Sequence, residues 1–397
     1  MTEAIGRHAS APTRGLLLIF LGAVWAGLVA LGLVLVSQLG MLPEGPDEWT
    51  YDWRTFLFSP AAKQPRSDIA VILIDEESMA DYDYLSPVDR GLTATLLQAV
   101  DTTRPRAVGL DFIFDRKSDD EKTNALITAI HDFSAPIIFG AIDLRVRGFR
   151  DEGLDFQENF IKRTGRQAGH VFFARQQETL KIGDQVVRYL GERSPAPSGR
   201  QSFARLLAEV AGVHAVEPAT PYIAWMRPPP GDDLFPLFRV PRHRPGSSAE
   251  IILPPSWRPA LKNRIVLIGG DFIDRDKHLT PLSIWDGARM PGVMVQAQIL
   301  AQLIDGRSIN LVPPKNELLI LTLVGFLGFL ITLRWLSKRF DWVLYFAGIG
   351  VLMLAGAILF STYSLLIPST TLFFAWTFGV TGGHYAPGIL QRARSAG

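Results

Sequence analysis

Four apolar segments constrain this chain more than any other feature of its sequence. They cover residues 15–36, 318–333, 342–360 and 365–385, and they approach the length of about 20 residues that a helix needs to cross a bilayer. The first segment stands alone, whereas the other three follow one another closely. The long region between them contains no apolar run of this length. The sequence therefore predicts an aqueous domain tethered by one transmembrane helix before it and three after it.

The predicted boundaries divide the chain into five parts. A tail (1–14) precedes the first transmembrane helix (15–37), the aqueous domain covers 38–314, three transmembrane helices cover 315–387, and a second tail (388–397) follows. A cleaved signal peptide is the alternative for the first segment, but its apolar core is long and no small-x-small cleavage pattern follows it. We therefore expect an uncleaved anchor. Its small pairs Gly22/Ala26 and Ala23/Gly27 would let another helix approach, either within this chain or in a homo-oligomer.

Positive charge indicates which side of the membrane holds the aqueous domain. In this topology the charges that flank the spans gather on one face, namely Arg7, Arg14, Arg334, Lys338, Arg339, Arg392 and Arg394. The short loop 361–364, on the other face, carries no charge. Because Lys and Arg near span ends stay in the cytoplasm, we expect both termini to be cytoplasmic and the domain to be extracytoplasmic.

Composition excludes some classes of function. The net charge of the 397-residue chain is +1, and no basic stripe suggests a nucleic-acid partner. Cysteine is absent, so disulfides and thiolate metal sites are excluded.

Apolar strands alternate with helical patterns along the aqueous domain. The predicted strands are 69–74, 107–110, 136–139 and 264–268, and the predicted helices are 89–100, 120–130, 203–210 and 293–304. This alternation is typical of βαβ units, so the predicted fold class is α/β, with a mainly parallel sheet flanked by helices. Residues 171–174 and 185–189 are predicted to form an antiparallel pair at the edge of the sheet. The proline-rich stretch 212–259 is predicted to be irregular.

Three of the predicted strands are each followed by an acidic residue, namely Asp75, Asp111 and Asp271. If these strands are parallel neighbours, their carboxyl ends share one edge of the sheet and the acids line one crevice. Such a crevice suits a cation, an amine or a hydroxyl-rich ligand. The alternative is that each acid caps a helix or braces a loop.

Other chemistries are less well supported by the sequence. Asp274, Asp276 and His278 could hold a metal, but the calcium-loop pattern is missing, and a cluster that braces its loop is the alternative. Gly269-Gly270 lacks the third glycine of a nucleotide-binding fingerprint. No Gly-x-Ser-x-Gly elbow of a serine hydrolase is present. We therefore predict no enzyme activity, no cofactor and no metal.

The whole pattern resembles the CHASE2 family of bacterial extracytoplasmic sensor domains. The resemblance is carried by Tyr51-Asp52-Trp53-Arg54, by 72–78 with Ser86-Pro87-Val88-Asp89-Arg90, by 107–114 and by 265–306. The last stretch includes Asp276-Lys-His-Leu-Thr280-Pro281 and Pro291-Gly292-Val293. Tyr84-Leu85-Ser86 stands where the family usually has a tryptophan before the proline. Family members commonly continue into a cytoplasmic kinase or nucleotide cyclase, and we expect this chain to be a stand-alone member.

The resemblance implies a sensor or receptor module in a bacterial inner membrane, with its domain in the periplasm. The candidate ligand-binding residues are Asp75, Ser78, Arg90, Asp111, Asp271, Asp276 and Thr280. The expected partners are the lipid bilayer, an unidentified extracytoplasmic ligand or protein, and a separate membrane or cytoplasmic signalling protein. The alternatives are a structural or assembly subunit of an envelope complex, which would use the domain for protein docking, and a hydrolase that would use the acidic cluster.

Overall fold

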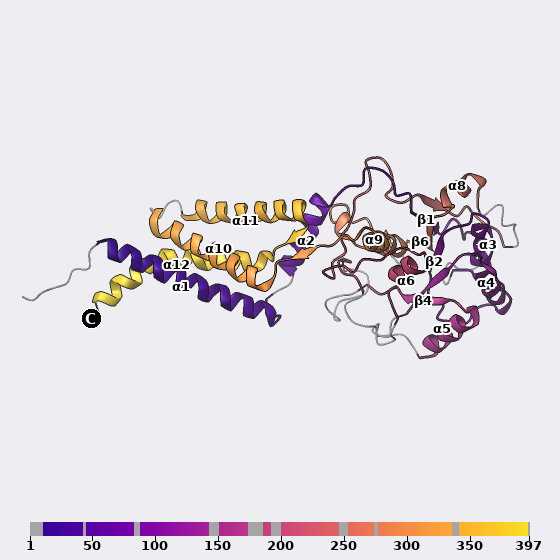
Figure 1. Cartoon of the computed structure of the whole chain (residues 1–397), viewed down its shortest axis with the longest axis horizontal. Coiled ribbons are helices and arrows are strands. Elements are labelled where there is room, and N and C mark those ends of the chain that lie inside the picture. The colour runs from indigo at the N-terminus through magenta and orange to yellow at the C-terminus, as the bar shows by residue number, and fades with distance from the viewer. Residues whose placement is uncertain are drawn as a thin grey trace, which may run out of the picture. The chain divides into compact units, whose positions relative to one another are not determined.

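The computed structural model describes residues 11–42, 45–82, 88–142, 151–173, 186–191, 200–245, 253–273, 277–335 and 341–395. These residues form two compact units. The α/β unit is Thr55–Ile309, and the helical unit combines the residues up to Arg54 with those from Asn310 onward. Figure 1 labels their helices and strands.

A six-stranded sheet forms the centre of the α/β unit. Its spatial order is β4-β3-β2-β6-β1-β5, and every neighbouring pair is parallel. The strands are β1 (Ile69–Ile74), β2 (Ala107–Asp111), β3 (Ile137–Ala141), β4 (Gln167–His170), β5 (Leu237–Arg239) and β6 (Ile265–Gly270). Every residue of β1 and β6 is buried, as expected for central strands covered on both faces. The predicted α/β fold with a mainly parallel sheet is confirmed.

Helices cover both faces of the sheet (Figure 1). On one face, α3 (Arg90–Asp101), α4 (Asp120–Asp132) and α5 (Asp151–Thr164) share a hydrophobic core with the strands. On the other face lie α6 (Phe203–Val210) and α9 (Gly292–Asp305). Glycines in the strands let this second layer approach closely. A Cβ on Gly109 would lie 2.7 Å from side-chain atoms of both Phe203 and Leu207.

Short elements complete the α/β unit. They are η1 (Pro255–Trp257), α8 (Arg258–Leu261), η2 (Pro281–Ser283) and the antiparallel pair β7 (Lys277–His278) and β8 (Met290–Pro291). The β7–β8 pair connects β6 to α9, and it therefore brings Lys277 close to the end of β6.

The edge strand β4 differs from the prediction. It precedes residues 171–174 and pairs with β3 in parallel, not antiparallel, orientation. Val186 and Tyr189 form isolated bridges instead of a strand, and residues 174–185 lie outside the described part of the chain. A tertiary contact explains why the strand forms at residues 167–170. Gly169 lies so close to the start of α6 that a Cβ on it would be 2.5 Å from the Cα of Phe203. The start of α6 thus fits against a glycine-containing edge that strand propensity does not favour.

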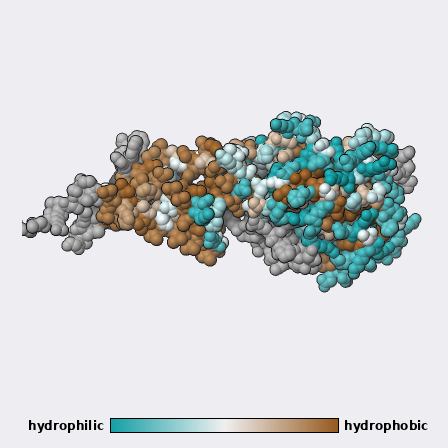
Figure 2. Space-filling model, in the orientation of Figure 1, coloured by the Kyte–Doolittle hydropathy of each residue, from teal (hydrophilic) through white to brown (hydrophobic). Residues whose placement is uncertain are grey.

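Long helices dominate the helical unit, and their surface is largely hydrophobic (Figure 2). They are α1 (Ala11–Gln38), α10 (Pro314–Trp335), α11 (Asp341–Tyr363) and α12 (Ser369–Ser395). A shorter helix, α2 (Gly45–Phe58), contributes its residues up to Arg54 to this unit. A short parallel pair, β9 (Asn310–Leu311) and β10 (Leu365–Leu366), precedes α10 and α12.

Three helices of the described chain are long and apolar enough to cross a membrane, namely Gly15–Gln38, Pro314–Leu333 and Trp342–Tyr363. They correspond to three of the four predicted spans. The fourth predicted span falls on β10 and α12, and α12 is not among these three candidates. Its sequence contains Thr381, His384 and Pro387, which make it less apolar than the others. The structure therefore supports three candidate spans and one further long helix that packs against α1, α10 and α11.

Glycines allow these helices to pack closely. On α12, Gly379 lies against the carbonyl of Gly325 on α10, and Gly383 lies against Thr332 and the carbonyl of Phe329. On α1, Gly22 packs against the ring of Phe329. The small pair Gly22/Ala26 of the first span therefore lies against α10 of this same chain, which is one of the two alternatives that the sequence allowed, whereas a Cβ on Gly27 would meet nothing within 4 Å.

Candidate ligand site at the carboxyl edge of the sheet

The three strand-end acids lie on neighbouring strands, as the sequence predicts. β6 lies between β1 and β2, with Ile74 paired to Gly270 and Asp111 paired to Gly269. Asp75 follows β1, Asp271 follows β6, and Asp111 is the last residue of β2. Because parallel strands end at the same edge, all three acids belong to one edge of the sheet.

Asp75 is held by a local loop. Its Oδ1 accepts a hydrogen bond from the backbone N–H of Ser78 (2.9 Å) and lies 2.8 Å from the Ser78 hydroxyl. The same hydroxyl lies 2.6 Å from the carbonyl oxygen of Val240. Ser78 is fully buried, so it anchors the loop after β1 rather than facing a ligand.

A cation joins Asp75 to Asp271. Arg239, the last residue of β5, donates from Nη1 to Asp271 Oδ2 (2.6 Å) and to Asp75 Oδ2 (3.2 Å). Burial alone would raise the pKa of Asp75, but hydrogen bonds from Ser78 and Arg239 outweigh burial and hold this pKa below its usual value. The hydrogen bond to Asp271 likewise raises the pKa of Arg239. Asp75 is therefore ionised at neutral pH.

Asp271 also faces a second cation. The Nζ atom of Lys277 lies 3.0 Å from Asp271 Oδ1, and the Asp271 side chain is only 9% exposed. We call Asp75, Asp271, Arg239 and Lys277 the charge cluster. It contains two carboxylates and two cations, so it is not the purely acidic crevice that the strand-end pattern suggested.

A pocket of about 450 Å³ opens beside the charge cluster. This volume is within the range of about 300–1,000 Å³ that small-molecule sites occupy. Its polar lining consists of Arg239, Asp271, Lys277, Thr280, Ser283 and Arg289, and its apolar lining includes Leu237, Leu282, Met290 and Met294. Three of these described side chains are cationic and one is anionic. The pocket therefore suits a ligand that combines an anionic group with an apolar part.

The structure brings some predicted site residues together and separates others. Asp271 and Thr280 line the pocket, and Asp75 joins them through Arg239. Asp111 is half-buried at the same edge of the sheet. Asp276 and Asp274 lie outside the described residues, as does the segment 83–87.

Arg90 does not line this pocket. Its guanidinium is buried and donates to Thr123 Oγ1 (2.7 Å) and to the carbonyl of Arg116 (2.5 Å). It also stacks over the rings of Phe114, Phe156 and Phe160, 5.3–5.8 Å from their centroids. Arg90 therefore joins α3 to the chain around α4 and α5 and does not line the pocket.

The predicted metal alternative concerned residues 274–278. In the described part of this stretch, Lys277 pairs with Asp271, and the His278 ring packs edge-on against Phe173 at 5.1 Å. No group of three or more metal-ligating side chains occurs among the described residues.

Sequence reasoning missed the cations of the site. Arg239 is the last residue of β5, a strand of three residues inside the proline-rich stretch that the sequence predicts to be irregular. Lys277 lies between Asp276 and His278, two of the residues that the sequence suggested as possible metal ligands. The sequence did contain one signal for this site, because Arg239 directly follows the apolar dipeptide Leu237-Phe238.

A model of the CHASE2 domain family matches residues 26–330, most of the chain. This match agrees with the resemblance of the sequence motifs. Neither the comparison with curated proteins nor that with solved structures found a match. The chain therefore belongs to the CHASE2 domain family of extracytoplasmic sensor domains.

Proposed function

We propose that this protein is a membrane-anchored sensor whose α/β unit binds a small anionic ligand and that it signals through a separate partner without catalysing a reaction. The observation that carries this proposal is the convergence of Arg239 and Lys277 on Asp271 at the wall of a pocket of about 450 Å³. Membership of a sensor-domain family supports the same class of function.

The charge cluster suggests how an anion would be recognised. A carboxylate or phosphate group could compete with Asp271 for Arg239 and Lys277, since both cations already make short contacts with a carboxylate. Arg289 adds a third positive charge to the lining. The apolar part of the ligand would contact Leu237 and Met294. This chemistry differs from the cation or amine that an acidic crevice would favour.

Binding would produce a signal by changing the charge cluster. Arg239 links β5 to the ends of β1 and β6, so an anion that withdraws it would loosen that link. A ligand shifts a conformational equilibrium only if it binds one arrangement better than the other. Binding would favour the arrangement in which Arg239 contacts the ligand over the one in which it contacts Asp75 and Asp271.

The proposed anchoring is four spans in a one-plus-three arrangement, with α12 as the fourth. Both termini would be cytoplasmic and the α/β unit periplasmic, in a bacterial inner membrane. The three apolar candidate helices and the packing of α12 against α1 and α10 support this arrangement. The basic residues that precede the first segment and those that follow the second and fourth segments support the orientation.

A thermal-shift experiment on the full-length protein in detergent tests the ligand proposal. Inorganic phosphate and a panel of small carboxylates should raise the melting temperature of the wild type, whereas amines and divalent cations should not. Arg239→Gln should abolish the rise. Asp271→Asn should strengthen anion binding about threefold or more, because it releases two cations from an ion pair.

Arg242→Gln is the matched control. Arg242 lies three residues from Arg239, pairs with Asp81 and does not line the pocket. Anions should therefore raise the melting temperature of this variant as much as that of the wild type. If Asp271→Asn abolished ligand binding and amines stabilised the wild type, Asp271 itself would be the recognition group and the anion proposal would be wrong.

Protein docking is the second candidate function. Two large apolar side chains of the α/β unit, Trp285 and Ile273, are 75% and 71% exposed, and exposed aromatic residues are typical of binding surfaces. A docking role predicts that Trp285→Ser releases a co-purifying protein and leaves any response to anions unchanged.

A further inference from the structure

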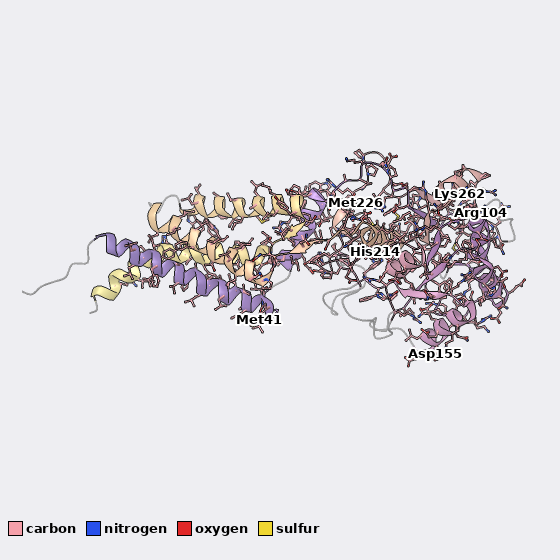
Figure 3. All side chains as sticks on the ribbon, viewed as in Figure 1. Met41, Arg104, Asp155, His214, Met226 and Lys262 are labelled. Atoms are coloured by element: carbon pink, nitrogen blue, oxygen red, sulfur yellow. The ribbon has the colours of Figure 1, made fainter. Side chains whose placement is uncertain are left out.

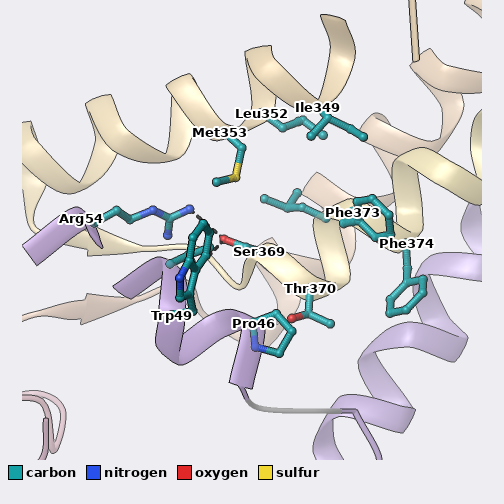
Figure 4. A pocket seen from close by; sticks show the side chains of 12 residues that line it. Pro46, Trp49, Arg54, Ile349, Leu352, Met353, Ser369, Thr370, Phe373 and Phe374 are labelled. Carbon is teal, nitrogen blue, oxygen red and sulfur yellow. Dashed lines mark hydrogen bonds between the residues drawn. The ribbon is translucent and has the colours of Figure 1, made fainter. Parts of the chain in front are cut away.

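A second pocket lies wholly within the helical unit, among α2, α11 and α12 (Figure 4). Its volume is about 360 Å³, and most of its wall is apolar, with Leu352 and Met353 from α11 and Phe373 from α12. The pocket also contains one cation, Arg54 of α2. An apolar pocket with a single charged group needs a ligand of matching, mixed character.

Arg54 is buried without a carboxylate partner among the described residues. It is 5% exposed, and its guanidinium donates to the carbonyl of Ile367 (3.1 Å) and to Ser369 Oγ (2.8 Å). Burial lowers the pKa of Arg54, and the nearby charge of Asp47 opposes this shift only in part. Asp47 is itself engaged, since its Oδ1 accepts the backbone N–H of Thr370. Arg54 therefore keeps donor capacity and charge that the protein does not neutralise.

The position of Arg54 depends on a glycine. A Cβ on Gly356 of α11 would lie 2.6 Å from Arg54 Nη2. The guanidinium therefore lies directly against the backbone of one of the three candidate transmembrane helices. Any larger residue at Gly356 would displace it.

The hydroxyl of Thr370 is a further polar group of the pocket. The Oγ1 atom of Thr370 is buried and has no hydrogen-bond partner among the described residues, and Thr370 lines the pocket beside Ser369 (Figure 4). A buried hydroxyl without a partner costs free energy unless a ligand or water supplies one. Arg54, Ser369 and Thr370 thus form a polar end, opposite the apolar wall.

The pocket opens outward between exposed apolar side chains. Trp49, Phe373 and Met353, which line it, are 55%, 42% and 41% exposed. In an aqueous environment such side chains would be unfavourably hydrated, whereas at a membrane they would face lipid. Tryptophan near the ends of apolar helices is typical of the membrane–water interface.

We propose that this pocket binds one phospholipid with an anionic headgroup, whose phosphate contacts Arg54 and the hydroxyls of Ser369 and Thr370 and whose acyl chain lies along Met353 and Phe373. The charge of Arg54 selects an anionic over a zwitterionic headgroup. The apolar wall selects a lipid over free phosphate. This inference rests on the membrane anchoring of the proposed function, but not on the ligand site of the α/β unit.

Native mass spectrometry of the full-length protein, purified from membranes in detergent, tests the proposal. Phosphatidylglycerol and phosphatidylcholine with identical acyl chains should be titrated separately, with inorganic phosphate as a third probe. The wild type should bind one phosphatidylglycerol about tenfold more tightly than phosphatidylcholine, because both lipids carry the phosphate but the choline group of the second adds a positive charge beside Arg54. Inorganic phosphate should not compete.

Two variants test the charge of Arg54 and the apolar wall of the pocket separately. Arg54→Gln keeps a hydrogen-bond donor but should remove the preference for phosphatidylglycerol. Met353→Trp fills the pocket from a partly exposed position and should weaken the binding of both lipids. Val351→Trp is the matched control, because Val351 is 65% exposed on α11 and does not line the pocket.

The lipid proposal is overturned if the wild type shows no preference, if the preference survives in Arg54→Gln, or if inorganic phosphate displaces the lipid. It is also overturned if Met353→Trp binds both lipids as tightly as the wild type does. Recovery of the chain without detergent in the soluble fraction would overturn the anchoring and the lipid site together. Recovery in membranes with no lipid preference would overturn the lipid site alone.

Discussion

Arg90 illustrates how a motif residue can serve the core instead of a site. It is 2% exposed, lies over three phenylalanine rings and donates to Thr123 and to the carbonyl of Arg116. A buried guanidinium in this setting is stabilised by cation–π contacts and charge-assisted hydrogen bonds. The arginine is therefore required for the packing of α3 and α4.

Arg90→Leu should lower the free energy of unfolding of the full-length protein by about 2–4 kcal/mol, because it removes the cation from the three phenylalanine rings and leaves the hydroxyl of Thr123 and the carbonyl of Arg116 without their donor. Chemical denaturation followed by circular dichroism measures this change. Arg116→Ala, which keeps the accepting carbonyl and removes an exposed side chain, should change stability little. Unimpaired stability of Arg90→Leu would contradict the structural role.

The strand-end acids could be predicted from the sequence, but their partners could not. A carboxylate after a fully apolar run is visible in the sequence at Asp75 and Asp271. Arg239 reaches both acids only because β5 pairs with β1, a contact between residues more than 160 positions apart. No local pattern carries information about such a pairing.

Helices and strands also differ in whether the local sequence or distant contacts determine them. β1 and α6 have the predicted bounds because an apolar run and an amphipathic repeat determine them locally. β5, α2 and α5 were not predicted. β5 lies among prolines, and α5 has a polar composition whose apolar contacts, such as that of Phe160 with Phe114, form only in the folded core.

The close packing of α10 on α12 makes Gly379 sensitive to substitution. A Cβ on Gly379 would overlap the carbonyl of Gly325, so Gly379→Ala should destabilise the helical unit by about 1–3 kcal/mol. At Gly350 of α11 a Cβ meets nothing within 4 Å. Gly350→Ala should therefore be neutral or stabilising, because alanine favours helix. Thermal unfolding of both full-length variants in one detergent compares them, and equal effects would contradict the packing.

The absence of cysteine allows the topology of the whole molecule to be tested with single-cysteine variants. Asp155→Cys, in the α/β unit, should react with a membrane-impermeant maleimide in cells whose outer membrane is permeabilised. Ser395→Cys, at the end of α12, should react only after the inner membrane is opened. Labelling of both sites from outside would show that α12 does not cross the membrane, and protection of residue 155 would contradict the periplasmic domain.

The order of the strands has a consequence for synthesis. β6 lies between β1 and β2 at the centre of the sheet, yet it is the last of the six strands to leave the ribosome. Until residue 270 has emerged, the group β4-β3-β2 and the group β1-β5 have no strand to join them, and such long-range pairing is intrinsically slow. A nascent chain stalled before residue 265 should therefore remain protease-sensitive in both groups of strands. Once residues 265–270 have also been released, both groups should become protease-resistant.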